Sequence, residues 1–511
     1  MHYFRKLNEN YYIYVILIFA LIPINFIPQL FDGVLIHYAF ESGNTEILLE
    51  SMYKNAGRPF HFLFINFIFF LSKLTLLPIE ILFDNLVIFF LIVFCMEVKK
   101  YSKLFFNLEK KWSNLAALFT ALFPVWHILV DFDIGLYLIS IYFLLFGFRQ
   151  FISQKLTQII IGSIFIILSF NVESNLSFVV GLGITYLILN KLNNTNNFSY
   201  LKLIFLILIS FGYYFMRELY FPPMGDLTGY QTVTWDKINS NLTIIKIIKN
   251  IVNYSTFFLL YLWIPVVFFL HLLFKNNKYS LKKVLHSNYT KNYFLLILLS
   301  GFAIFPYLIV DKSSTILSFT DYYQRHAFLL APIFGMFFSI MFKDMEKINC
   351  LQNKINLNFY FIIFIVVNLF LLNCGNYKKV ESYLIRDGLI EELKYSGSIP
   401  KGNVKFIGKN IPFFFRPFEL NYLLYKAYGA TAWWSTPFHF HINKVLKPSA
   451  YEGGKGKSRK QLTFAIAGEY KDECNIYIYL ENDLTKYERL KRFYVLNHRS
   501  YYNIDKILKK C

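Results

Sequence analysis

The sequence has few charged residues and few cysteines. Charged side chains make up 16% of its 511 residues, whereas soluble domains contain about 25%. The five cysteines are odd in number and lack metal-ligand spacing, so they indicate neither a zinc site nor a disulfide framework. The segment 453–460, GGKGKSRK, lacks the GxxxxGK[ST] spacing of a phosphate loop, and we expect a mobile loop there. The first apolar segment has no small-residue cleavage site, so we expect a retained anchor rather than a signal peptide.

Long apolar runs are abundant instead. Hydrophobic residues make up 56% of the chain, and runs of roughly 17 or more recur up to residue 375, enough to cross a hydrocarbon core about 30 Å thick. We predict a polytopic α-helical membrane protein with about 11 spans and one juxtamembrane helix. The expected spans lie near 11–30, 79–98, 113–130, 134–150, 157–172, 176–191, 201–219, 254–274, 293–310, 326–343 and 357–374.

The distribution of Lys and Arg predicts the orientation. Arg5 and Lys6 precede the first span, which puts the N-terminus in the cytoplasm and Asp32 outside. The apolar run 61–77 either crosses the membrane or lies along its outer surface. The second choice, which Lys73 also favours, gives cytoplasmic loops about twice as many basic residues as the outer loops before residue 375. The net charge of +20 is therefore explained by topology, and we expect no nucleic-acid partner.

The chain changes character at Gly375. Charges become frequent, 404–407 and 475–479 read as strands, and 382–395 reads as an amphipathic helix. We therefore divide the chain into a transmembrane domain, 1–374, and a small extracytoplasmic α/β domain, 375–511.

The stretch 31–60 is a polar connector at the expected outer surface. It begins with Asp32 and ends with Arg58-Pro59, and Glu41 and Lys54 lie between them. Long polar connectors often carry function, although a solvated loop with ordinary charges is an equal alternative.

Other ionisable residues lie at the expected outer ends of the spans, where charge is costly unless it faces a cavity or a partner. Each also has a structural interpretation: Arg217 could snorkel, His127 could be a buried hydrogen-bonded histidine, and Asp131 or Asp133 could cap a helix rather than bind a divalent ion. The set comprises His127, Asp131, Asp133, Glu173, Arg217, Glu218, Arg325 and His326.

This layout resembles the GT-C superfamily of membrane glycosyltransferases. The resemblance rests on the acid directly after the first span (Asp32), the Arg-Pro that starts a juxtamembrane helix (Arg58-Pro59), the acids of the second outer connector (Asp131 and Asp133) and an outer C-terminal domain. Many members have two adjacent acids where this chain has Asp-Gly, which leaves dependence on a divalent cation open.

The resemblance implies an inverting transfer of a sugar from a polyprenyl-phosphate carrier to a glycan, lipid or protein acceptor at the outer face of the plasma (inner) membrane. Asp32 is then the expected catalytic base, because an acceptor hydroxyl needs a carboxylate to take its proton. Arg58 and Arg325 are the expected ligands of the donor phosphate. Lys54 and His326 are further candidates for the phosphate, and Asp131, Asp133, Glu41 and Glu173 are candidates for the acceptor or a metal.

Two other functions remain open. An O-antigen-type polysaccharide polymerase or ligase usually has a large outer loop between late spans, whereas loop 220–253 is modest. A lipid-linked glycan transporter (flippase) tends to have internal repeats and helices broken near the midplane. We find no repeat, and the charges cluster at helix ends.

Overall fold

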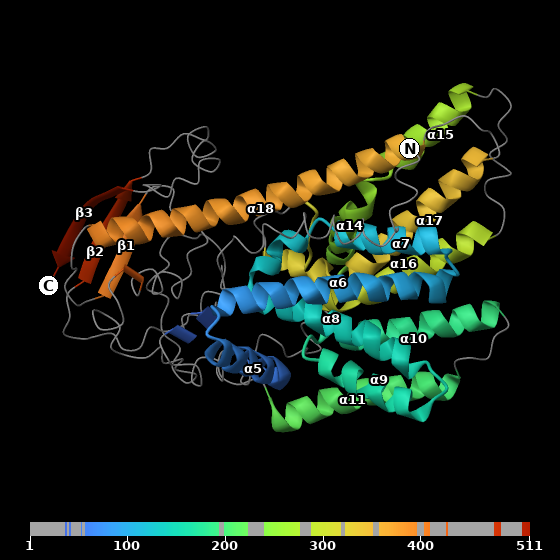
Figure 1. Cartoon of the computed structure of the whole chain (residues 1–511), viewed down its shortest axis with the longest axis horizontal. Coiled ribbons are helices and arrows are strands. Elements are labelled where there is room, and N and C mark those ends of the chain that lie inside the picture. Colours follow the sequence, from blue (N-terminus) through green and yellow to red (C-terminus); the bar gives the residue numbers. More distant parts are fainter. Residues whose placement is uncertain are drawn as a thin grey trace.

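The computed structural model describes most of the helical part of the chain and short stretches of the C-terminal part (Figure 1). The described residues are 36–37, 40–41, 53, 57–193, 199–222, 240–275, 288–317, 322–350, 357–395, 403–408, 426–427, 475–481 and 503–510. The α-helices are α5 (Pro59–Thr75), α6 (Ile79–Phe106), α7 (Lys110–Ala121), α8 (Phe132–Phe151), α9 (Leu156–Ser169), α10 (Ser174–Leu192), α11 (Tyr200–Tyr220), α14 (Ile244–Leu259), α15 (Trp263–Lys275), α16 (Asn288–Ile309), α17 (Leu330–Cys350) and α18 (Leu357–Tyr395). Two 3-10 helices, η3 (Trp126–Val130) and η6 (Tyr322–Ala327), connect them.

Six of the described helices are long and apolar enough to cross a membrane, which makes the chain a multi-pass membrane protein. The sequence predicted about eleven spans; the first, 11–30, lies outside the described residues. Others are shorter helices: the expected span 157–172 is the 14-residue helix α9, about 21 Å long. The six candidate spans are Ile79–Phe106, Phe132–Phe151, Ser174–Leu192, Tyr200–Tyr220, Lys291–Ile309 and Asn358–Tyr377.

Two expected spans are interrupted. Helix α7 ends at Ala121, before Pro124, and the expected span 113–130 continues only as turns and η3. A proline disfavours the helical conformation in the residue before it. The expected span 254–274 is divided between α14 and α15, and Pro265 lies in the first turn of α15, where proline is tolerated.

Helix α8 lies at the centre of the bundle and is the most buried of the six candidate spans. A Cβ on Gly135 would lie 2.5 Å from Cζ of Phe83 in α6, and a Cβ on Gly147 would lie 2.8 Å from the carbonyl oxygen of Gly162 in α9. Small residues at helix contacts let membrane helices approach closely. Glycines on two sides of α8 therefore allow α6 and α9 to pack against it.

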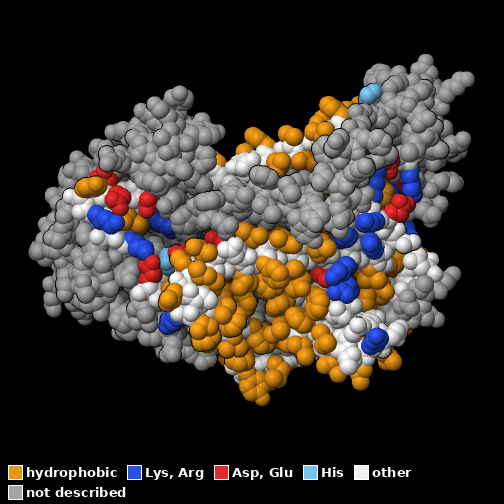
Figure 2. Space-filling model, viewed as in Figure 1, with side chains coloured by type: hydrophobic (Ala, Val, Ile, Leu, Met, Phe, Trp, Pro, Cys, Tyr) orange, Lys and Arg blue, Asp and Glu red, His pale blue; other side chains and the backbone are white. Residues whose placement is uncertain are grey.

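The bundle presents a hydrophobic surface between two polar ends. Figure 2 shows hydrophobic side chains across the middle of one face, with Lys and Arg on both sides. Helices α5 and α11 contribute exposed Phe67, Phe70, Phe211 and Phe215. A contiguous surface of this kind is expected where lipid surrounds the protein.

The two polar ends differ in their residues. One end contains the ion pair between Arg149 of α8 and Glu97 of α6, and the pair between Lys111 and Glu346. Arg149 and Lys111 belong to segments that the sequence placed in the cytoplasm. The other end contains Arg58 and the starts of α8 and α10. The alternation of the helices across the membrane and the side that each end faces stay predictions.

Helix α18 runs unbroken for 39 residues and joins the expected span 357–374 to the expected helix 382–395. Gly375 lies within it, where a Cβ would be 2.2 Å from Cγ of His127. His127 is buried, and its Nδ1–H donates a 2.9 Å hydrogen bond to the carbonyl of Pro124. The change in polarity at Gly375 therefore falls inside a helix rather than in a linker.

The end of α18 lies beside three strands (Figure 1). Strand β1 (Asn403–Gly408) pairs in parallel with β2 (Asn475–Glu481), which pairs antiparallel with β3 (Asn503–Lys510). The stretches 404–407 and 475–479, which we predicted from the sequence to be strands, lie in β1 and β2. A separate C-terminal α/β domain remains a prediction.

Candidate functional site

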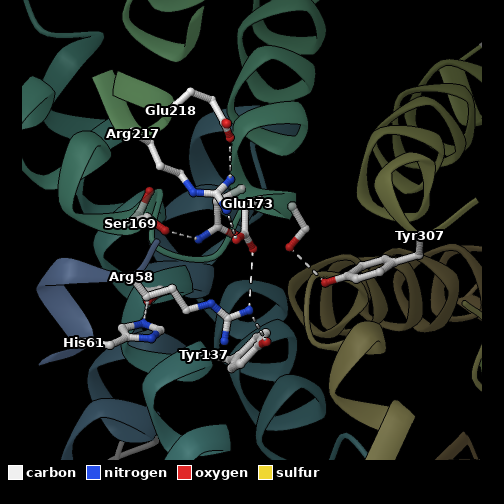
Figure 3. Close-up of polar contacts among 11 residues, drawn as sticks. Arg58, His61, Tyr137, Ser169, Glu173, Arg217, Glu218 and Tyr307 are labelled. Atoms are coloured by element: carbon white, nitrogen blue, oxygen red, sulfur yellow. Dashed lines mark hydrogen bonds and ion pairs between the residues drawn. The ribbon is translucent and has the colours of Figure 1, made fainter. Parts of the chain in front are cut away.

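Charged side chains from separate parts of the chain meet at the end of the bundle where α8 and α10 begin (Figure 3). Arg58 directly precedes α5, Glu173 lies between α9 and α10, and Arg217 lies in the last turn of α11. Arg325 lies in η6. Arg58 and Arg325 converge on Tyr137, one turn into α8, and Glu173 links Arg58 to Arg217. The sequence predicted this gathering of acids and bases at the helix ends, but not Tyr137.

The local chain conformation positions Arg58. Gly57 has φ +74°, a left-handed conformation that glycine adopts without strain. The Arg58 amide donates a 2.8 Å hydrogen bond to the carbonyl of Tyr53. Pro59 is the first residue of α5, a position whose N–H has no partner within the helix, so proline loses no hydrogen bond there. The guanidinium is thereby directed inward, and its Nη2 donates a 3.2 Å hydrogen bond to the Tyr137 hydroxyl.

Arg325 reaches the same tyrosine. Cζ of Arg325 lies 5.6 Å from the centre of the Tyr137 ring, and Cζ of Arg58 lies at the same distance, 5.6 Å. A guanidinium within about 6 Å of an aromatic ring centre is stabilised by the ring electrons. Arg325 is 7% exposed, so its charge is held at the bundle end rather than in bulk water. The two predicted phosphate ligands therefore share one neighbour.

Glu173 and Arg217 extend this group of charges. Oε2 of Glu173 lies 3.7 Å from Nη2 of Arg58, and Oε1 lies 3.5 Å from Nη2 of Arg217. Arg217 also lies 3.9 Å from Glu218. Only 4% of Arg217 is exposed, so it does not snorkel to the surface. A Cβ on Gly57 would lie 2.5 Å from Nε of Arg217, which shows how closely Arg217 packs beside Arg58.

Asp131 and Asp133 lie at the start of α8. The Asp131 carboxylate is the N-cap and accepts a 3.0 Å hydrogen bond from the Asp133 amide. Asp133 accepts a 3.5 Å hydrogen bond from the Tyr53 hydroxyl. Capping satisfies one of the unpaired amides at a helix start, so this structural alternative holds for Asp131. Within the described part of the chain, no three His, Cys, Asp or Glu side chains lie close enough together to hold a metal ion.

His326 lies behind Arg325. Its ring is 4.5 Å from that of Tyr307, whose hydroxyl donates a 2.9 Å hydrogen bond to Ser174. Burial, and then the charges of Arg325, Lys312 and Arg58, lower the pKa of His326 well below its usual value. The imidazole is therefore neutral at pH 7, and it could contact an anion only through a hydrogen bond, not as a cation.

Glu41 belongs to a different group of charges. His37 Nε2 lies 3.0 Å from Glu41 and 2.8 Å from Glu80 of α6, and Lys426 donates a 2.6 Å hydrogen bond to Glu41. Burial would lower the pKa of His37, but its hydrogen bonds to Glu41 and Glu80 outweigh burial and raise this pKa. Burial would raise the pKa of Glu41, and His37 and Lys426 lower it instead. His37 therefore joins the N-terminal segment to α6, and Glu41 joins it to Lys426 of the C-terminal part.

Two predicted site residues, Asp32 and Lys54, lie outside the described residues. Sequence reasoning missed Tyr137, and it placed Arg217 among the ionisable groups at the helix ends without giving it a part in the phosphate site. Arg217 had a recognisable signal, a basic residue near the end of an apolar span. Tyr137 had none, because tyrosine is common throughout this chain and its role depends on which arginines surround it.

Comparisons of this chain with protein-family models, with curated proteins and with solved structures gave no match. The site is therefore interpreted from its own chemistry.

Proposed function

We propose that the protein is an inverting glycosyltransferase that moves a sugar from a polyprenyl-phosphate carrier to a glycan, lipid or protein acceptor at the outer face of the membrane. The observation that carries the proposal is the convergence of Arg58 and Arg325 on Tyr137 at one end of the bundle. Two arginines far apart in the sequence thus lie beside the same tyrosine, and we propose that the carrier phosphate binds there.

The chemistry of the reaction fits arginine. The leaving group is a lipid phosphate, and it gains negative charge as its bond to the sugar breaks. Buried cations stabilise such developing charge far better than cations in water do. A guanidinium can also hold two phosphate oxygens through parallel hydrogen bonds, which fixes their direction. Arg58 and Arg325 would supply both effects, whether or not a divalent ion also binds.

The acceptor hydroxyl needs a base, and Asp32 remains our proposal for it. The two alternatives from the sequence are engaged elsewhere: Asp131 caps α8, and Glu41 contacts His37 and Lys426. Asp32 follows the first expected span directly, so its carboxylate would stand at the same outer surface.

The surroundings suit a substrate with a lipid tail. Helix α5 begins beside Arg58 and exposes Leu63, Phe67 and Phe70. A polyprenyl chain could lie against such a surface within the bilayer while its phosphate reaches the arginines. A soluble nucleotide-sugar donor has no lipid tail to pack against this hydrophobic surface.

A polysaccharide polymerase or ligase would use the same class of lipid-linked donor, and it differs in transferring whole glycan chains. A flippase would move the donor without breaking a bond. The charges described here lie at the bundle end rather than in the middle of the spans, which favours transfer over transport.

The experiment has two parts. Mass spectrometry of cell-surface glycans with and without the gene should reveal a missing sugar substituent, and its mass identifies the sugar. The purified protein in vesicles should then transfer that sugar from the polyprenyl-phosphate carrier. Movement of the donor across the vesicle membrane without transfer would support the flippase instead, and loss of long glycan chains rather than of one substituent would support the polymerase.

A further inference from the structure

The Glu173 carboxylate occupies the space between the guanidinium groups of Arg58 and Arg217 (Figure 3). Each of its oxygens faces one arginine, at 3.7 Å and 3.5 Å. Glu173 precedes the first residue of α10, where the helix dipole also favours negative charge. The two guanidinium groups and the start of α10 thus all favour an anion at the position of the Glu173 carboxylate.

The fit of Glu173 in this place is loose. Charge-assisted hydrogen bonds between nitrogen and oxygen normally measure about 2.7–2.9 Å, and both distances are longer. Oε1 of Glu173 is buried and has no hydrogen-bond partner among the described residues. The pair formed by Arg149 and Glu97 at the opposite end is different, because Nε of Arg149 lies 2.6 Å and Nη2 lies 3.2 Å from the two carboxylate oxygens. The ion pair between Arg149 and Glu97 is thus held by two hydrogen bonds, whereas the ion pairs of Glu173 are longer.

The Glu173 carboxylate is more exposed to solvent than the two arginines beside it. The Glu173 side chain is 31% exposed, whereas those of Arg217 and Arg58 are 3% and 13% exposed. Glu173 also lies at the end of a short connector between α9 and α10. Its side chain can rotate into water without moving a helix, while the two arginines remain in place.

We propose that Glu173 is an internal substitute for a phosphate group, which displaces it and binds between Arg58 and Arg217. When no phosphate is bound, the carboxylate reduces the repulsion between the two guanidinium groups, a repulsion that is strong away from water. The phosphate group then takes over this role with more acceptor oxygens. This inference rests on the proposed function for the source of the phosphate, the lipid carrier, and it adds Arg217 to the binding site.

The proposal has a measurable consequence. A ligand that must first displace an internal competitor binds with an affinity reduced by the fraction of sites that are open. Removing the charge of Glu173 should therefore tighten phosphate binding, although most substitutions in a binding site weaken it. A carboxylate that merely positions the arginines would have the opposite effect.

The test measures binding to the full-length protein in detergent by titration calorimetry. The probes are a polyprenyl phosphate, the polyprenol of equal chain length, and inorganic phosphate. We expect Glu173→Gln to bind the polyprenyl phosphate about 5-fold or more tightly than the wild type, and Arg217→Gln to bind it about 10-fold more weakly. Glu218→Gln is the matched control: it removes the same charge beside Arg217 but does not bridge to Arg58, and we expect a change below about 2-fold.

Weaker or unchanged binding in Glu173→Gln would overturn the proposal, as would unchanged binding in Arg217→Gln. If Glu173→Gln does not fold, Glu173→Asp provides the same test, because its shorter side chain cannot reach both arginines and should also tighten binding. Polyprenol binding as tightly as polyprenyl phosphate would show that the site does not recognise phosphate. Inorganic phosphate binding equally tightly would support the displacement and assign the phosphate to a free anion rather than a lipid.

A parallel measurement of sugar transfer separates this inference from the proposed function. Tighter phosphate binding in Glu173→Gln without any sugar transfer by the wild type would support the displacement of Glu173 by phosphate and contradict the proposed glycosyltransferase function. Sugar transfer by the wild type together with weaker phosphate binding in Glu173→Gln would support the glycosyltransferase function and contradict the displacement of Glu173.

Discussion

At the scale of single residues, the site depends on where a few charges are held. Arg58 is the clearest case. Gly57 turns the chain before it, Pro59 starts a helix after it, and Tyr137 receives its hydrogen bond. These three neighbours fix the direction of the guanidinium, so substitutions beside Arg58 should matter as much as substitutions of Arg58 itself.

Gly57→Ala tests this dependence. Alanine is strained at φ +74°, and its Cβ would lie 2.5 Å from Nε of Arg217 and 3.1 Å from the carbonyl oxygen of Phe221. We expect a loss of stability of about 1–2 kcal/mol together with a strong loss of transfer, measured as the melting temperature and the rate in vesicles. An equally stable and fully active variant would show that Arg58 and Arg217 need not be packed so closely.

Asp32→Asn tests the proposed base. The two side chains are nearly equal in size, so the variant should insert and fold normally. An amide cannot accept the proton of the acceptor hydroxyl, and loss of a general base typically lowers the rate about 10² to 10⁴-fold. Donor binding should change much less, because the acid acts on the acceptor.

Glu41→Gln and Asp131→Asn are the comparisons for Asp32→Asn. Normal transfer in Asp32→Asn, with loss in either comparison, would move the base to that residue. Normal transfer in all three would argue against the glycosyltransferase itself.

At the scale of elements, sequence reasoning succeeded where the signal is local. The start of α5 at Pro59 and the apolar runs of α6, α8 and α10 follow from the order of residues alone. It failed at residues 260–262, because this break between α14 and α15 consists of Leu-Tyr-Leu and is as apolar as the helices around it. The break is stabilised from outside by the hydrogen bond between Tyr261 and Asn368 of α18, 2.7 Å long.

The same limit applies to the candidate site. The sequence identified Arg58, Arg325 and Glu173, because charges near apolar helix ends are conspicuous. It could not identify Tyr137 as their common neighbour, or the bridge from Glu173 to Arg217. Those contacts depend on how α8, α10 and α11 pack against one another. The position of Arg217 also depends on Gly57, where a Cβ would lie 2.5 Å from its Nε, and this effect is visible only when the opposing side chain is known.

The contact between His37 and its two carboxylates predicts a pH effect. The pKa of His37 is raised above 6.5, so its stabilising contribution is complete below pH 6.5 and is lost as the pH rises through the raised value. The pKa of Glu41 is lowered below 4.5, so its contribution is lost only in acid. Each unit of pKa shift corresponds to about 1.4 kcal/mol. Asp84 of α6, one turn beyond Glu80, is a further titratable carboxyl group near this contact.

We therefore expect the melting temperature of the wild type to fall as the pH rises above 6.5, and that of His37→Gln to fall less. His271→Gln is the control, since the His271 ring in α15 forms a 3.2 Å hydrogen bond with the hydroxyl of Tyr360 in α18. Identical pH profiles for the wild type and His37→Gln would show that this contact does not contribute to stability.

At the scale of the whole molecule, the arrangement of charge predicts the orientation in the membrane. Lys99 to Lys111 and Lys275 to Lys291 should lie in the cytoplasm, and the Asp32 segment and residues 375–511 should lie outside. A membrane-impermeant thiol reagent applied to intact cells should not label Lys283→Cys, and it should label it after the cells are opened. Labelling from outside in intact cells would reverse the orientation and put the arginine site on the cytoplasmic side.

The central claim is that Arg58 and Arg325 together bind the phosphate of a lipid-linked sugar donor. Its most direct test is sugar transfer from the polyprenyl-phosphate carrier by purified protein in vesicles. Arg58→Lys and Arg325→Lys keep the charge but lose the paired hydrogen bonds, and each should lower the rate about 10-fold or more. Arg149→Lys makes the same change at the opposite end of the bundle, and at equal amounts of inserted protein its rate should stay within about 2-fold of the wild type. Wild-type rates in Arg58→Lys, Arg58→Ala and Arg325→Lys would contradict the claim.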